Sequence, residues 1–236
     1  MRGIGAILTV LTVLGAGLLG AAFALAKGPG MAGGLVFKFG PDLAASNWHY
    51  VSFPRRHGAE FQAHGDETIV VQAKAGVGLL WHSVPPWGSD ASNARWRWRV
   101  MEGVGPTDLS KKGGDDRALA IYFAFADDEE DISEQTDLVD LLRQERGYVL
   151  VYAWGGIDRR GSVLPLPYFG GRGATVVKRA ANARQGVWFT ETAALSDDFR
   201  SAFGRAPGKL VAVAVSSDSD DTGDVNLAAV ADFCIN

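Results

Sequence analysis

Nine residues near the C-terminus, SSDSDDTGD at 216–224, bring together side chains well suited to holding a cation. Asp218, Asp220 and Thr222 occupy alternate positions, and Gly223 follows them. Oxygen ligands at alternate positions before a glycine form the first half of a calcium loop. The predicted metal ligands are Asp218, Asp220, Thr222 and Asp224, and the expected ion is a structural calcium.

This calcium pattern is incomplete, which leaves two other interpretations open. The twelfth position counted from Asp218 is Ala229, where an EF-hand loop carries a bidentate Glu. In the second interpretation the segment is a hairpin loop whose aspartates accept hydrogen bonds from local backbone N–H groups. In the third it is one wall of a site for a polar ligand.

Asp115 and Asp116 are expected to complete such a site. They follow two glycines and precede an apolar run, whereas Asp218 comes at the end of another apolar run. Neighbouring antiparallel strands place the start of one beside the end of the next. Carboxylates brought together in this way repel one another unless a cation or an arginine neutralises them. Solvation of two separate strand ends is the alternative.

The segment ARWRWRV at 94–100 alternates with the period of a strand. Trp96, Trp98 and Val100 share one face, which we expect to lie in the core. Three arginines share the other face. Guanidinium groups in a row on a sheet need pairing or solvation.

Arg97, in the middle of this arginine row, has two expected roles. It pairs with Glu191, Asp115 or Asp116, or it binds a polar or anionic ligand on a concave face. Structural pairing is favoured.

Aromatic side chains suggest a carbohydrate ligand. Sugars stack their apolar C–H faces on aromatic rings, while carboxylates and arginines bond their hydroxyls. Trp87 lies in PPWGSD, a loop by its Pro and Gly content, and Trp154 ends an apolar run before GGIDRRG. Trp87 is the first candidate for an exposed platform and Trp154 the second, and core packing is the alternative for each of them. The predicted ligand-binding residues are Asp115, Asp116, Arg97, Trp87, Trp154 and Glu191.

Signals for catalysis are weak. The chain has no Gly-x-Ser-x-Gly, His-Glu-x-x-His or Walker sequence, and its four histidines lack metal-ligand spacing. Glu191 and Asp116 offer a carboxylate pair for glycoside hydrolysis, but nearly any sandwich offers such a pair. No catalytic residue is predicted, and a non-enzymatic role is favoured.

These residues are carried by short apolar runs of strand length, rich in Val, Ile and aromatic residues and bounded by turn residues. The runs cover 67–73, 77–83, 94–100, 117–126, 147–154, 174–180, 186–191, 209–215 and 226–235. They predict an all-β fold, an antiparallel β-sandwich of jelly-roll type. Two segments show helical spacing instead: 133–146, with Ser133 as N-cap, and 196–204, with Ser196 as N-cap and Gly204 at its end.

The first 26 residues have the pattern of a secretory signal peptide. Arg2 precedes an apolar run that ends in Ala-Leu-Ala at 24–26. We expect cleavage there, a Gly-rich tether at 27–47 and a single sandwich domain at 48–236, located in the periplasm or secreted. The run is also long enough to span a bilayer, so an uncleaved inner-membrane anchor is the alternative.

Charge and cysteine content narrow the choice of partners. Without the leader the chain has 22 Lys and Arg against 27 Asp and Glu, a net charge of −5. This balance argues against a nucleic-acid partner. The single Cys234 cannot form an intrachain disulfide, so the stability of the exported domain must come from its hydrophobic core.

Several motifs occur in the order found in a known family. They are RWRWRV, GGDDRALAIYFAF, YVLVYAW, VWFTETAALSDDFRSAFG and SDSDDTGD. Together they resemble the secreted bacterial proteins grouped as domain of unknown function 3047, and the resemblance covers nearly all of the chain after the leader. It implies a β-sandwich like those of carbohydrate-binding modules, and it implies no activity.

Three functions are therefore expected, in decreasing order. The first is non-catalytic binding of a carbohydrate or other envelope polymer. The second is a carboxylate-dependent hydrolase or lyase acting on an envelope polysaccharide. The third is a structural or assembly role in which the arginine face meets a partner.

Overall fold

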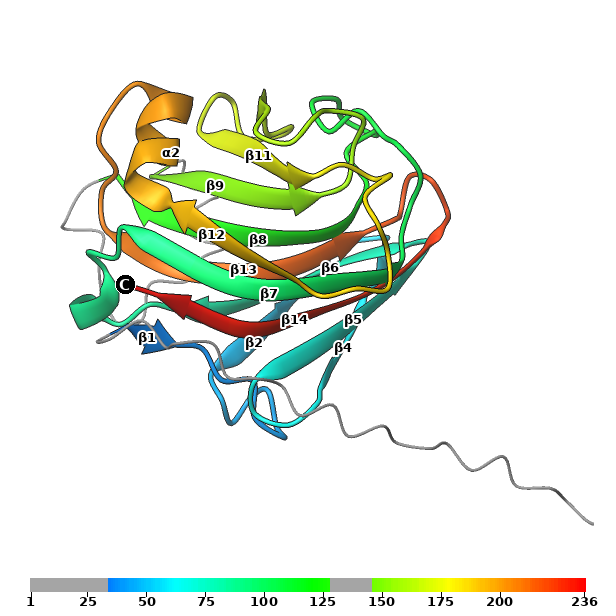
Figure 1. Cartoon of the computed structure of the whole chain (residues 1–236), viewed down its shortest axis with the longest axis horizontal. Helices are drawn as coiled ribbons and strands as arrows, with labels where there is room; N and C mark the ends of the chain where they lie inside the picture. The colour runs from blue at the N-terminus through cyan, green and yellow to red at the C-terminus, as the bar shows by residue number, and fades with distance from the viewer. Residues whose placement is uncertain (1–33, 128–145) are drawn as a thin grey trace, which may run out of the picture. The chain divides into compact units, whose positions relative to one another are not determined.

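The computed structural model describes residues 34–127 and 146–236. Within these ranges the strands form two sheets that pack face to face (Figure 1). The six-stranded sheet contains β12 (Phe189–Ala194), β7 (Asn93–Glu102), β14 (Val225–Ile235), β5 (Thr68–Lys74) and β4 (Glu60–Ala63) in this order, with β1 (Leu35–Val36) also paired to β14.

The eight-stranded sheet carries the candidate site. Its order is β10 (Val163–Pro165), β11 (Gly173–Arg179), β9 (Gly147–Trp154), β8 (Arg117–Ala126), β13 (Leu210–Asp218), β6 (Gly76–Ser83) and β2 (Trp48–Val51), with β3 (His57–Gly58) paired to β6. All pairs are antiparallel except β11–β9 and β3–β6. The predicted β-sandwich of jelly-roll type is confirmed.

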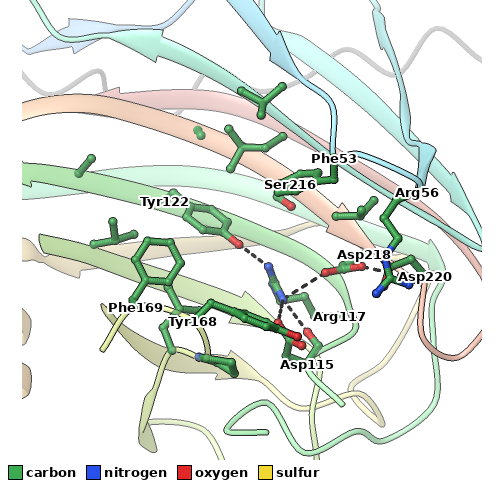
Figure 2. A pocket seen from close by; sticks show the side chains of 18 of the residues that line it. Phe53, Arg56, Asp115, Arg117, Tyr122, Tyr168, Phe169, Ser216, Asp218 and Asp220 are labelled. Carbon is green, nitrogen blue, oxygen red and sulfur yellow. Dashed lines mark hydrogen bonds and ion pairs between the residues drawn. The ribbon is translucent and has the colours of Figure 1, made fainter. Parts of the chain in front are cut away.

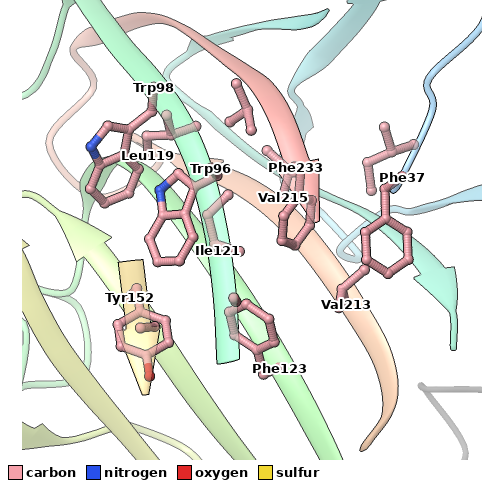
Figure 3. Close-up of a cluster of buried hydrophobic side chains, with 14 of the residues drawn as sticks. Phe37, Trp96, Trp98, Leu119, Ile121, Phe123, Tyr152, Val213, Val215 and Phe233 are labelled. Atoms are coloured by element: carbon pink, nitrogen blue, oxygen red, sulfur yellow. The ribbon is translucent and has the colours of Figure 1, made fainter. Parts of the chain in front are cut away.

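The core between the sheets is rich in aromatic residues, because the strands alternate as the sequence predicts. Trp96 and Trp98 of β7 are fully buried, and Trp96 contacts Phe123 of β8 and Tyr152 of β9 (Figure 3). Trp98 contacts Trp154 of β9. Burial of side chains of this size contributes roughly 1.5–3 kcal/mol each to the free energy of unfolding.

Helix α2 (Leu195–Phe203) packs its apolar side on this core. Phe199 and Phe203 contact each other with ring centroids 4.6 Å apart, and Gly204 ends the helix in the left-handed conformation, as predicted. The predicted N-cap is wrong. The N-cap is Ala194, without a side-chain hydrogen bond, and Ser196 lies inside the first turn.

Two further expectations concern the chain ends and connections. The predicted helix at 133–146 falls almost wholly outside the described residues. Part of the predicted tether belongs to the domain, because Phe37 and Phe39 are buried in the core and β1 pairs with β14. Among the described residues, no helix has the length and apolar character needed to cross a bilayer.

Candidate functional site: a cavity on the eight-stranded sheet

The two acidic segments meet at one end of the sandwich, as the sequence predicts. Strands β8 and β13 are antiparallel neighbours, and Asp218 stands opposite Arg117 in their register. The loop that follows Asp218, residues 219–224, is not a hairpin, however. It leaves β13 in the eight-stranded sheet and leads into β14 in the six-stranded sheet (Figure 1). This acidic loop therefore links the two layers.

Asp116 holds the acidic loop in place through hydrogen bonds from the loop's backbone. Its side chain is fully buried and accepts hydrogen bonds from the backbone N–H of Thr222 at 2.7 Å and of Asp221 at 3.4 Å. Asn226 at the start of β14 donates to the main-chain oxygens of Asp218 and Arg117. These bonds satisfy backbone groups that the crossing between sheets would otherwise leave buried and unpaired.

Arg117 is the centre of a polar cluster that also contains Asp115, Tyr122, Asp218 and Asp220 (Figure 2). Its guanidinium donates to the Tyr122 hydroxyl and, at 2.5 Å, to the main-chain oxygen of Asp115. The same nitrogen lies 3.6 Å from a carboxylate oxygen of Asp115 and 3.6 Å from one of Asp218. Arg117 therefore attracts both carboxylates without donating a hydrogen bond of ordinary length to either.

A second arginine neutralises the outer part of the cluster. Arg56, in the loop after β2, lies 3.0 Å from a carboxylate oxygen of Asp220 and 3.6 Å from one of Asp221. We expected an arginine of the 95–99 row to take this role. That expectation is wrong, because the row lies on the six-stranded sheet, and Arg56 and Arg117 take the role instead.

The electrostatics of the cluster favour protonated carboxyls. Burial is the main cause that raises the pKa of Asp218 to about 7, with smaller contributions from the nearby Asp116, Asp220 and Asp115 and against the opposing effect of Arg117. Burial also raises the pKa of Asp115 and of Asp220. Burial lowers the pKa of Arg117, but Tyr122, Asp218 and Asp115 outweigh it, so Arg117 stays charged.

This polar cluster closes one end of a cavity of about 710 Å³ on the outer face of the eight-stranded sheet. The floor is apolar, because outward-facing positions of the central strands carry small or aliphatic residues. They include Leu79, Ala124, Val149, Ala212 and Ala214. Tyr122 brings the only hydroxyl-bearing side chain that β8 contributes to this floor.

Two loops from opposite edges of the sheet form the walls of the cavity. The loop after β2 contributes Phe53, and the loop between β10 and β11 contributes Tyr168 and Phe169. Phe53 is 39% exposed and Tyr168 is 62% exposed. Figure 2 shows both of these side chains beside the polar cluster, on either side of Arg117. The cavity thus offers aromatic surface, an apolar floor and a charged end.

The two predicted tryptophan platforms lie elsewhere. Trp154 is only 1% exposed and packs between Trp98 and Phe189 in the core, so the expectation that it is exposed is wrong. Trp154 belongs to the inward-facing set of β9. Trp87 is 70% exposed, as predicted, but it follows the end of β6 remote from Asp218 and does not line the cavity.

Arg97 does not reach the cavity either. It lies on the outer face of the six-stranded sheet, 3.0 Å from Asp232, and its guanidinium covers the Trp188 ring. Structural pairing was expected, but the partners predicted for it are wrong. Asp232 comes within reach because a bulge in β14 gives it a left-handed backbone, with φ of 52°.

Glu191 lies between the sheets rather than on the arginine face. It stands opposite Trp96 in the register, so it shares the inward face of that tryptophan. Its carboxylate is buried and ion-paired with Arg179 at 2.6 Å and Arg160 at 2.7 Å. It therefore neutralises a buried charge cluster and does not line the cavity.

The predicted calcium site is only partly assembled. Among the described residues, the carboxylates whose oxygens lie within 4.8 Å of one another are Asp116, Asp220 and Asp221. Asp218 instead faces Arg117, and Asp224 is exposed. Three carboxylate oxygens suit calcium, but Arg56 already approaches two of them. Calcium binding stays a prediction.

Sequence reasoning missed Arg117, Tyr122, Arg56, Phe53 and Tyr168. A signal was present in RALAIYFAFA, where Tyr122 interrupts a face of alanines. Small residues alternating with large ones show that the outer face is also shielded, and a lone hydroxyl there marks a polar contact. Nothing local in the sequence shows that the two edge loops fold over this face.

The comparison with protein families gives one match. The profile described as "Protein of unknown function (DUF3047)" matches residues 46–234. The chain belongs to the DUF3047 family. No curated protein matches it.

Solved structures of low identity align with most of this DUF3047 chain. A mutant of the Cel12A cellulase of Rhodothermus marinus is 13% identical, with a TM-score of 0.44 over 82% of this chain and 93% of that one. The xyloglucanase domain of NopAA from Sinorhizobium fredii is 7% identical, with a TM-score of 0.44 over 80% and 92%. A loop-swap mutant of Xyn11A from Necallimastix patriciarum is 13% identical, with a TM-score of 0.33 over 79% and 92%. At these values the likeness carries no conclusion about this chain.

Proposed function

We propose that the domain binds a carbohydrate chain, without cleaving it, in the cavity on the eight-stranded sheet. The observation that carries the proposal is the pairing of aromatic walls with a charged end in one cavity. Sugar rings present both apolar C–H faces and hydroxyl groups, so they need both kinds of surface. Phe53 and Tyr168 supply the aromatic faces, and Asp115, Arg117 and Asp218 supply the hydrogen-bonding groups.

The periplasm is the proposed location, supported by the leader pattern at 1–26. A polymer of the bacterial envelope is then the natural ligand. An assembly role remains the alternative, and a protein partner that competes with the sugar at the cavity would support it.

The test is calorimetric binding of soluble oligosaccharides by the protein without its leader. We expect Tyr168→Ala to weaken binding at least about tenfold, because aromatic stacking in a cavity is worth on the order of 1.4 kcal/mol or more. Trp87→Ala is the matched control, since it removes an equally exposed aromatic side chain outside the cavity. Equal affinities for the two variants, or no binding by the wild type, would overturn the proposal.

A second candidate, glycoside hydrolysis, rests on a different observation. Asp115 and Asp218 each lie 3.6 Å from the same guanidinium nitrogen, so these oxygens are at most about 7 Å apart and the two carboxyl groups are close enough to act on one glycosidic bond. The pKa of Asp218 is about 7, as suits a general acid. New reducing ends formed by the wild type and not by Asp218→Asn would favour this candidate over simple binding.

A further inference from the structure

The carboxyl group of Asp218 is a buried acceptor with few donors. The residue is 8% exposed and lines the cavity. The nearest donors that the described residues bring to its side chain are the Asp220 N–H at 3.5 Å and Arg117 at 3.6 Å. Both distances exceed those of a normal hydrogen bond to a carboxylate. A buried acceptor left in this state costs free energy that a ligand donor recovers.

The charged end of the cavity also has more carboxyl groups than guanidinium groups in its lining. Four carboxylates line it against two guanidinium groups, Asp115, Asp218, Asp220 and Asp221 against Arg56 and Arg117. The remaining lining cation, Arg172, shares the carboxylate of Asp127 with Arg205, at 3.1 Å and 2.8 Å. The excess disfavours anionic ligands and attracts a cation.

The aromatic walls of the cavity also favour a cationic ligand. Tyr168 and Phe53 line the same cavity as the carboxylates. Ring faces attract cations, and cavities that combine aromatic rings with carboxylates recognise ammonium groups. The lysine Lys112 already lies 4.9 Å from the centroid of the Tyr168 ring, so this ring accepts a cation in the structure.

On this basis, and resting on the proposed carbohydrate binding, we propose that the preferred ligand is an amino sugar whose ammonium group sits between Asp115, Asp218 and the aromatic walls. The sugar ring lies along the apolar floor, and its ammonium group donates hydrogen bonds to the two carboxylates that Arg117 leaves without one. A uronic acid or other anionic sugar is excluded by the same charges.

The experiment compares three hexamers of one β-1,4 backbone by calorimetry at about pH 7, where an amine is still largely charged and Asp218 is partly ionised. They are a glucosamine hexamer, cellohexaose, which has a hydroxyl in place of each amine, and a glucuronic acid hexamer. We expect the glucosamine hexamer to bind at least about tenfold more tightly than cellohexaose, and the glucuronic acid hexamer not to bind. Asp115→Asn and Asp218→Asn should each remove most of that preference, measured as the ratio of the affinities of one variant for the glucosamine hexamer and for cellohexaose.

Asp197→Asn is the control variant, because this exposed carboxylate on α2 is far from the cavity lining and should leave every affinity unchanged. Equal affinity for the glucosamine hexamer and cellohexaose overturns the amino-sugar inference and leaves carbohydrate binding standing. A preference that survives both cavity variants, or that Asp197→Asn also removes, shows nonspecific attraction and overturns the inference. Absence of binding by all three hexamers counts against this inference and the proposed function together.

Discussion

At the scale of single residues, two buried charged groups have opposite relations to their surroundings. Glu191 is satisfied by Arg160, Arg179 and the Trp98 indole N–H, whereas Asp218 is held near a cation without a close donor. Glu191 therefore serves the fold, because nothing remains for a ligand to contact. Asp218 keeps bonding capacity that faces the cavity.

Glu191→Ala should destabilise the domain by about 3–5 kcal/mol, because it leaves the partly buried Arg179 without its counterion. Arg160→Gln should cost less than about 1 kcal/mol, since the Arg160 side chain is largely exposed. Urea unfolding of both variants measures the difference. Equal losses would show that the ion pair with Arg179 has no special role.

The pKa of Asp218 predicts how stability depends on pH. Its folded value of about 7 lies above its ordinary value of 3.8, so the folded state binds this proton more tightly. The contribution to stability is full below the ordinary value and is lost as pH rises toward 7, by about 1.4 kcal/mol for each unit that separates the two values.

Asp218→Asn should therefore become more stable relative to the wild type as pH rises from about 4 to 8. Denaturant unfolding in buffer with a chelator measures this difference across the range. A constant difference, or one of the opposite sign, would mean that the carboxyl is ionised throughout.

At the scale of elements, the acidic loop between β13 and β14 joins the two sheets and closes the cavity. Millimolar calcium should raise the melting temperature of the wild type, because an ion held by Asp116, Asp220 and Asp221 stabilises the folded state by mass action. Asp220→Asn should lose most of this rise. A melting temperature unmoved by calcium or chelator would show that Arg56 and Arg117 neutralise the loop unaided.

The strands were predictable and the cavity was not, for physical reasons. Alternation in ARWRWRV and the long apolar runs reflect local burial, so the sequence predicts the β-sandwich. The meeting of Asp115 and Asp116 with Asp218 was one of two alternatives, because it depended on the pairing of their two strands. The prediction that Trp154 is exposed was wrong, because the residue lies on the inward face at the end of its strand. Phe53 and Tyr168 were missed because they come from loops more than 100 residues apart, joined only by the folded sheet.

At the scale of the whole molecule, the leader pattern makes a prediction that the folded domain does not address. The Ala-Leu-Ala at 24–26 predicts cleavage after Ala26. N-terminal sequencing of the protein from a periplasmic fraction should begin at Lys27. Recovery of intact Met1 with the membranes would show that the apolar run is an anchor.

The central claim is that the cavity on the eight-stranded sheet holds a carbohydrate chain. A crystal structure of the protein without its leader, grown with the oligosaccharide that binds it most tightly, tests this claim most directly. We predict a sugar ring packed against Tyr168 and Phe53, with polar groups bonded to Asp115 and Asp218. An empty cavity with the sugar on Trp87, or on the face of Arg97 and Trp188, would contradict it.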